Sequence, residues 1–85
     1  MTNQQASKIN EYKAYFTQLL PVDLWLPALR RTKEDIRFLE SIYQTGGEHN
    51  RYSRQFQDAA AHERNELCLK TSALHSLLRE KEATP

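Results

Sequence analysis

Glycine and proline are scarce in this chain, and this scarcity is its most informative feature. Glycine occurs twice among 85 residues, at the adjacent positions Gly46 and Gly47, and proline occurs three times. These two residue types interrupt helices most strongly, so long uninterrupted helices are expected on either side of one break. The lack of other glycines also excludes a glycine-rich phosphate-binding loop. The sequence therefore predicts an all-α fold built around a helical hairpin.

Cysteine, long apolar runs and an excess of one charge are also lacking. The single cysteine, Cys68, cannot form an internal disulfide, and the polar start from Met1 to Ser7 does not resemble a signal peptide, so we expect a cytoplasmic location. No apolar run approaches the roughly 18 residues of a bilayer span, so no membrane partner is expected. Twelve Lys and Arg residues against eleven Asp and Glu leave a net charge of +1, which argues against a strong global attraction for nucleic acid or anionic lipid.

Apolar residues recur at three- and four-residue steps in three segments, which is the pattern of amphipathic helices. The first helix is expected over about 5–20, ending before Pro21. The second is expected over about 24–44, where Pro27 is tolerated near the first turn. The third is expected over about 48–81. We treat 1–85 as a single helical domain with frayed ends at 1–4 and 82–85.

The length of the third helix limits how the three helices can pack. At 1.5 Å per residue it would be roughly 50 Å long, nearly twice the length of the second helix. The economical arrangement continues the line of the second helix with the first across the proline-containing bend, so that both run antiparallel to the third. The alternative folds the first helix back to make a three-helix bundle.

A hairpin turn centred near Gly46 predicts a specific register between the second and third helices. It places Phe56 opposite Ile36 and brings together two pairs of opposite charge, Glu63 with Arg30 and Lys70 with Asp23. We interpret these pairs as setting the alignment of the helices, because exposed ion pairs add little stability.

The segment 19–29 is apolar almost all the way round, which one neighbouring helix cannot cover. We interpret it as a protein interface with Trp25 as its anchor, because tryptophan is frequent at binding hot spots. The alternative is that this bend is the local core of a three-helix bundle. The expected interface residues are Leu20, Val22, Leu24, Trp25, Leu26 and, on the back of the third helix, Leu69.

Residues that could carry chemistry are few. His62 and Glu66 lie one helical turn apart with Asp58 in the preceding turn, but the second histidine of a zinc-protease motif is missing, so no metal site is expected. Cys68 has no histidine or acid at helical spacing to activate it and is expected to be a small buried residue. We therefore expect neither an enzyme nor a cofactor.

Basic residues near one end of the hairpin favour a different function, association with nucleic acid. Acidic residues at 34, 35 and 40 lie among them and weaken their electrostatic attraction for phosphate groups. The spacing of a helix-turn-helix motif is also absent. The six residues of this basic patch are Arg30, Arg31, Lys33, Arg37, Arg51 and Arg54.

Seven residues within one stretch of about 20 follow a recognisable pattern: His49, Tyr52, Arg54, Phe56, Asp58, Arg64 and Leu67. In these residues the stretch resembles a helix of the primosomal replication-restart protein PriC. No function is transferred from this resemblance, because the rest of the chain does not follow the pattern.

The sequence therefore predicts a small, non-enzymatic helical regulator or adaptor that acts as an inhibitor, an antirepressor-like protein or a chaperone-like protein. It is expected to be a homodimer and to dock another protein through 19–29. The alternatives are the nucleic-acid-associated protein and a purely structural homo-oligomer. The identity of the target is left open.

Overall fold

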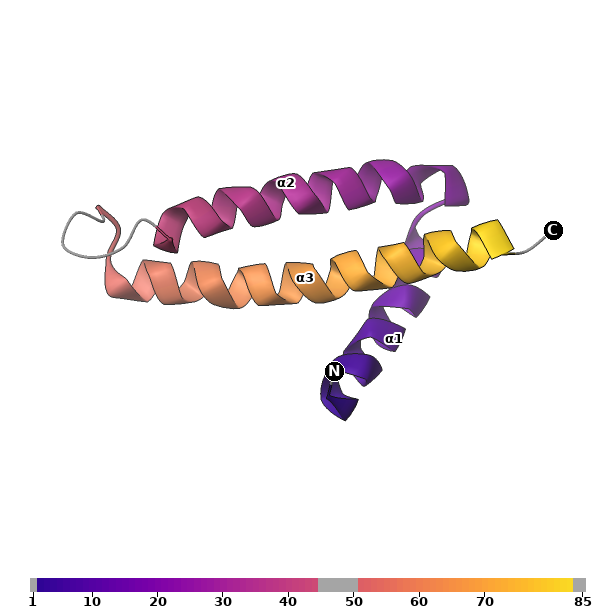
Figure 1. Ribbon diagram of the computed structural model, residues 1–85, viewed down its shortest axis with the longest axis horizontal. Coiled ribbons are helices and arrows are strands. Elements are labelled where there is room, and N and C mark those ends of the chain that lie inside the picture. Colours follow the sequence, from indigo (N-terminus) through magenta and orange to yellow (C-terminus); the bar gives the residue numbers. More distant parts are fainter. Residues whose placement is uncertain (1, 45–50, 84–85) are drawn as a thin grey trace.

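The computed structural model describes residues 2–44 and 51–83, and their secondary structure is entirely helical. Three α-helices, α1 (Asn3–Leu19), α2 (Trp25–Tyr43) and α3 (Arg54–Ala83), are joined at the first connection by a short 3-10 helix, η1 (Val22–Leu24). Helices α2 and α3 lie side by side and antiparallel (Figure 1). The predicted all-α hairpin is thus confirmed. Among the described residues, no helix is long and apolar enough to cross a bilayer.

Helix α1 begins with a capping box that its sequence encodes. The Thr2 hydroxyl accepts a hydrogen bond from the Gln5 backbone N–H at 3.1 Å, and the Gln5 side chain accepts one from the Thr2 N–H at 3.0 Å. This reciprocal pair satisfies two of the amide groups that a helix start leaves without partners. Because of this cap, α1 extends into the segment that the sequence analysis expected to fray.

The chain reverses direction between α1 and α2. Leu20 is extended, as expected for a residue that precedes proline, and it ends α1. The Leu24 N–H then donates to the Pro21 carbonyl at 2.9 Å, which closes the 3-10 turn before α2 starts at Trp25. This tight turn prevents α1 from continuing the line of α2.

Helix α1 folds back against α3, so the three-helix alternative is adopted in place of the end-to-end arrangement. Lys8 contacts Glu66, and Lys13 contacts Glu80 further along the same helix. Residue numbers therefore rise together along α1 and α3, and α1 crosses α3 at an angle (Figure 1). The physical reason is burial, since in this position the apolar stripe of α1 is enclosed. A first helix that continued the line of α2 would instead run antiparallel to α3.

The main core lies where all three helices meet, at the end of the hairpin opposite the loop. Leu74 and Ala73 are fully enclosed at its centre. Because the ion pairs of α1 with α3 lie at Glu66 and Glu80, the part of the hairpin near the loop consists of α2 and α3 alone. The core residues are Ile9, Phe16, Trp25, Leu29, Ala73, Leu74 and Leu77.

Helix α3 begins later than predicted. The Ser53 hydroxyl accepts a hydrogen bond from the Phe56 N–H at 3.2 Å, which caps a helix that starts at Arg54. Serine is among the preferred residues at this position. The predicted break at Gly46 and Gly47 and the predicted helix start at 48 lie outside the described residues.

The register between α2 and α3 also differs from the prediction. Arg64 pairs with Glu40 at 3.3 Å, which displaces the alignment by about eleven residues, close to three turns at 3.6 residues per turn. The predicted register assumed a tight turn at the glycines, whereas ten residues separate Tyr43 from Arg54.

The two predicted register pairs are consequently wrong. None of the ion pairs among the described residues joins Glu63 to Arg30 or Lys70 to Asp23. The Lys70 ammonium instead lies 5.5 Å from the centre of the Tyr12 ring of α1. Glu63 lines a hollow between α2 and α3.

Candidate protein-binding surface

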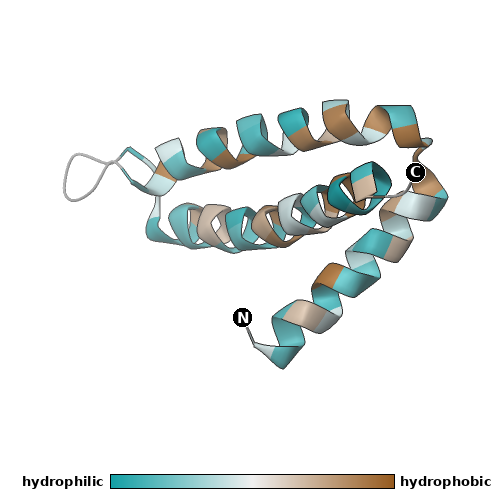
Figure 2. Ribbon diagram, turned by 45° about the vertical axis from the view of Figure 1, so that its right-hand side comes forward, coloured by the Kyte–Doolittle hydropathy of each residue, from teal (hydrophilic) through white to brown (hydrophobic). Residues whose placement is uncertain are grey.

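Four large apolar side chains lie on the outside of the corner between α1 and α2. They fall within eight consecutive residues, and the corner is coloured hydrophobic in Figure 2. We name this set the corner patch: Leu19 (56% exposed), Val22 (43%), Leu24 (44%) and Leu26 (44%).

The shape of the corner explains why these side chains are exposed. Successive residues of a tight 3-10 turn project in different directions, so the core can receive only some of them. Trp25 points into the core, while its neighbours Leu24 and Leu26 remain nearly half exposed. Val22 and Trp25 border a shallow hollow of about 520 Å³ with Leu77 and the charged side chains that follow it.

Trp25 is not the exposed anchor that the sequence analysis expected. It is only 7% exposed and belongs to the core, because α1 folds over the position that we assigned to an external partner. Its indole Nε1 is buried and has no hydrogen-bond partner among the described residues. Leu20 and Leu69, also predicted at the interface, are partly buried and pack against the same core. Of the predicted interface, Val22, Leu24 and Leu26 remain at the surface.

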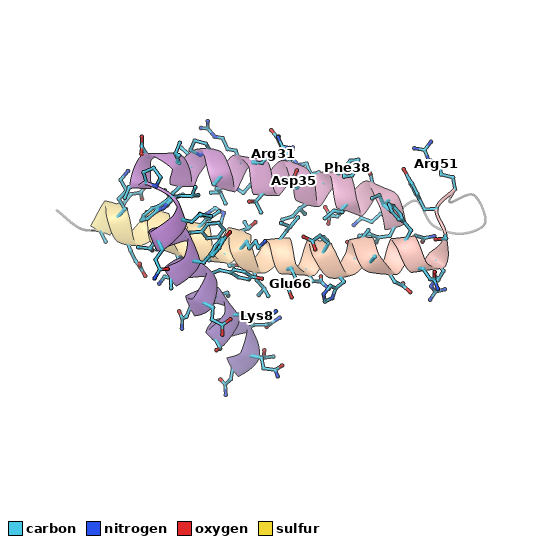
Figure 3. All side chains as sticks on the ribbon, turned by 180° about the vertical axis from the view of Figure 1, so that it is seen from behind. Lys8, Arg31, Asp35, Phe38, Arg51 and Glu66 are labelled. Atoms are coloured by element: carbon cyan, nitrogen blue, oxygen red, sulfur yellow. The ribbon has the colours of Figure 1, made fainter. Side chains whose placement is uncertain are left out.

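A polar cluster holds α1 against α3 on the flank of the core. The two oxygens of the Glu66 carboxylate accept hydrogen bonds from two different α1 residues, the Lys8 ammonium at 2.8 Å and the Tyr12 hydroxyl at 2.6 Å. Lys8 and Glu66 approach each other from their two helices in Figure 3. The Glu66 side chain is 22% exposed and the Lys8 side chain 49%, so water screens part of their ion pair.

These contacts shift the pKa values of all three groups. The hydrogen bond to Glu66, followed by burial and the negative charge of Glu66, raises the pKa of Tyr12 to about 12. The same carboxylate raises the pKa of Lys8, and hydrogen bonds from Lys8 and Tyr12 lower the pKa of Glu66. At neutral pH Glu66 is therefore ionised and Tyr12 is protonated. Such a cluster fastens two helices and is not poised for proton transfer.

The histidine and the two acids that were considered as metal ligands do not form one site, because the acids are bound by other residues. Glu66 is bound by Lys8 and Tyr12, and Asp58 pairs with Arg54 at 3.7 Å, while His62 is exposed. In 2–44 and 51–83, no three His, Cys, Asp or Glu side chains converge on one point. Cys68 is a free, half-buried thiol.

The predicted basic patch is divided by local pairing. Arg31 binds Asp35 at 3.3 Å on α2, and the guanidinium of Arg51 stacks 5.2 Å from the centre of the Tyr52 ring (Figure 3). Since Arg54 is also paired, half of the patch is already engaged. The remaining three residues follow each other at helical spacing on an exposed face of α2: Arg30, Lys33 and Arg37.

Lys33 also affects a histidine that the sequence analysis did not single out. Burial, together with the positive charges of Lys33 and Arg79, lowers the pKa of His75 on α3. The imidazole of His75 therefore loses its proton more readily than that of an unperturbed histidine.

The sequence analysis also missed Phe38, which at 66% is the most exposed large apolar side chain in the part of the chain that the structure describes. Helical periodicity could have found it, because Phe38 lies about 100° round the helix from the inward-facing Leu39. Phe56 was assigned to the inner stripe but is 48% exposed. Both aromatic rings lie near the loop end of the hairpin, where α1 does not reach.

Comparison of the chain with protein-family models, with curated proteins and with solved structures gave no match.

Proposed function

We propose that this chain is a small, non-enzymatic regulator or adaptor that binds another protein through the corner patch. The observation that carries the proposal is the exposure of Leu19, Val22, Leu24 and Leu26 on one corner of a domain whose core is already complete. Exposed apolar clusters of this kind mark interaction sites in soluble proteins.

The character of the surface favours a protein partner over a small molecule. Small-molecule sites enclose most of their ligand in a concave pocket, whereas the corner patch lies on the outside of a turn. Charged residues flank it, with Asp23 inside the turn and Arg30 one turn beyond it. An apolar centre with a polar rim is the usual composition of a protein interface.

Substitutions at the patch test this function without disturbing the core. Leu26→Asp and Val22→Asp place a charge where the partner would bury an apolar group. Leu26 lies in the first turn of α2, where an acidic side chain is favourable to the helix dipole, so the variant is expected to fold. Gln4→Asp is the matched control, since it adds the same charge at an exposed position in the first turn of α1, at the end of that helix away from the patch.

The measurement is capture of partners from a lysate of the native host by tagged wild type and by each variant, with helix content checked by circular dichroism. We expect the two patch variants to lose at least tenfold in capture of a specific partner, equivalent to about 1.4 kcal/mol or more. Gln4→Asp should retain that partner. A partner retained equally by all four proteins would show that the corner patch is not its binding site.

A further inference from the structure

A second apolar surface lies at the other end of the molecule, on the half of the hairpin that α1 leaves uncovered. It is a hollow of about 340 Å³ between α2 and α3. Figure 1 shows that α1 diverges from the hairpin before it reaches this region. We name it the hairpin groove, and its principal residues are Phe38, Ile42, Phe56, Ala59, Ala60 and Glu63.

The hairpin groove combines a projection and a recess in one patch. The Phe38 ring is the most exposed large apolar group of the described residues, and it stands on the α2 side. The α3 side carries Ala59 and Ala60, whose short side chains leave the hollow open. The Phe56 ring beside them stacks on Tyr52 with centroids 5.1 Å apart, which fixes its position before any partner binds.

The chain exposes more surface than a compact protein of its mass, because the molecule is elongated. Its accessible area is 6414 Å², whereas a compact protein of 10.0 kDa exposes about 5,200 Å². Its radius of gyration is 15.2 Å, against about 12 Å for a compact domain of this length. The excess of roughly 1,200 Å², taken over the whole chain, is more than the 800 Å² that each partner buries in an interface of standard size.

From these observations we propose that a second copy of the chain binds the hairpin groove and forms a two-fold symmetric dimer. A two-fold interface uses the same patch on both subunits, so the patch must supply both the projection and the recess. In the dimer, Phe38 of each copy fills the recess beside Ala59 and Ala60 of the other. The net charge of +1 produces little repulsion between copies.

The dimer is distinct from the proposed function, because the hairpin groove and the corner patch lie at opposite ends of the hairpin. Sedimentation equilibrium from low to high micromolar concentration tests it directly. We expect a dimer for wild type and at least a tenfold higher dissociation constant for Phe38→Glu and for Ala59→Glu, both at exposed positions. Leu26→Asp, in the corner patch, is the control and should leave the dissociation constant unchanged.

The wild-type protein supplies an independent measurement that does not depend on any variant folding. A dimer stabilises its folded state by mass action, so its melting temperature should rise with protein concentration. A wild type that stays monomeric, with a melting temperature independent of concentration, would overturn the proposal. A dimer that resists both groove substitutions would also overturn it, and loss of the dimer in Leu26→Asp alone would assign self-association to the corner patch instead.

Discussion

The hydroxyl of Tyr12 on α1 donates a 2.6 Å hydrogen bond to the carboxylate of Glu66 on α3, which also accepts from Lys8. This one carboxylate therefore fastens α1 to α3 at the flank of the core, since it binds two side chains that are one turn apart on α1. The placement of α1 in turn decides which apolar residues at the corner are covered.

Removing the Tyr12 hydroxyl is expected to weaken this junction. Tyr12→Phe keeps the ring but loses the hydrogen bond, and we expect the melting temperature to fall by about 2 to 6 °C because the bond is only partly buried. Glu66→Gln should also lower it. Because both changes act on the same contact, thermal unfolding of the double variant should show less than the sum of the two single effects. Strict additivity would show that the two residues do not interact.

The raised pKa of Tyr12 can be observed directly by NMR titration of the tyrosine ring carbons. We expect Tyr12 to titrate near pH 12 in wild type and closer to its ordinary value of 10.0 in Glu66→Gln. Between these values the unfolded chain loses the proton first, so the contribution of Tyr12 to stability is complete below pH 10 and is lost as pH rises toward 12. An unchanged titration in Glu66→Gln would mean that this carboxylate is not the main cause.

Acidification should destabilise the protein through His75. Its pKa is lowered from 6.5 by burial and by the charges of Lys33 and Arg79, so the unfolded state binds the proton more readily. Stability is therefore complete above about pH 6.5 and is lost as pH falls through the folded pKa. Thermal unfolding between pH 7.5 and 5 should show a falling melting temperature in wild type and a smaller fall in His75→Gln. Equal slopes for the two proteins would exclude this histidine as the cause.

Truncation of Leu74 tests whether the three-helix junction is the main source of stability. Leu74 is fully enclosed, so Leu74→Ala should cost about 2 to 5 kcal/mol and lower the melting temperature by more than about 10 °C. Leu26→Ala removes the same atoms from a side chain that is 44% exposed and should have a much smaller effect. Chemical denaturation of the two variants compares them. Similar losses would mean that the enclosed position of Leu74 contributes no more than a surface site.

Local patterns in the sequence account for the helices and for the all-α hairpin fold. The stripe that contains Ile9 and Phe16 predicted α1, Pro21 predicted its end, and the scarcity of glycine predicted the hairpin. Three of the apolar side chains at the corner, Val22, Leu24 and Leu26, were also predicted at an interface and are found at the surface. These features depend on a few neighbouring residues, which is why they can be predicted from spacing alone.

The register of α2 against α3, the direction of α1 and the burial of Trp25 were decided by the tertiary structure. Each depends on a competition between alternative packings of the same helices, which local sequence patterns do not distinguish. The loop length and the contacts of Glu66 with α1 help to select the packing that forms. The sequence by itself therefore determined that three amphipathic helices form and that one corner carries more apolar residues than a two-helix hairpin could cover. Only the folded chain determined that α1 covers Trp25 and leaves Phe38 exposed, because burial is a property of the whole arrangement of helices.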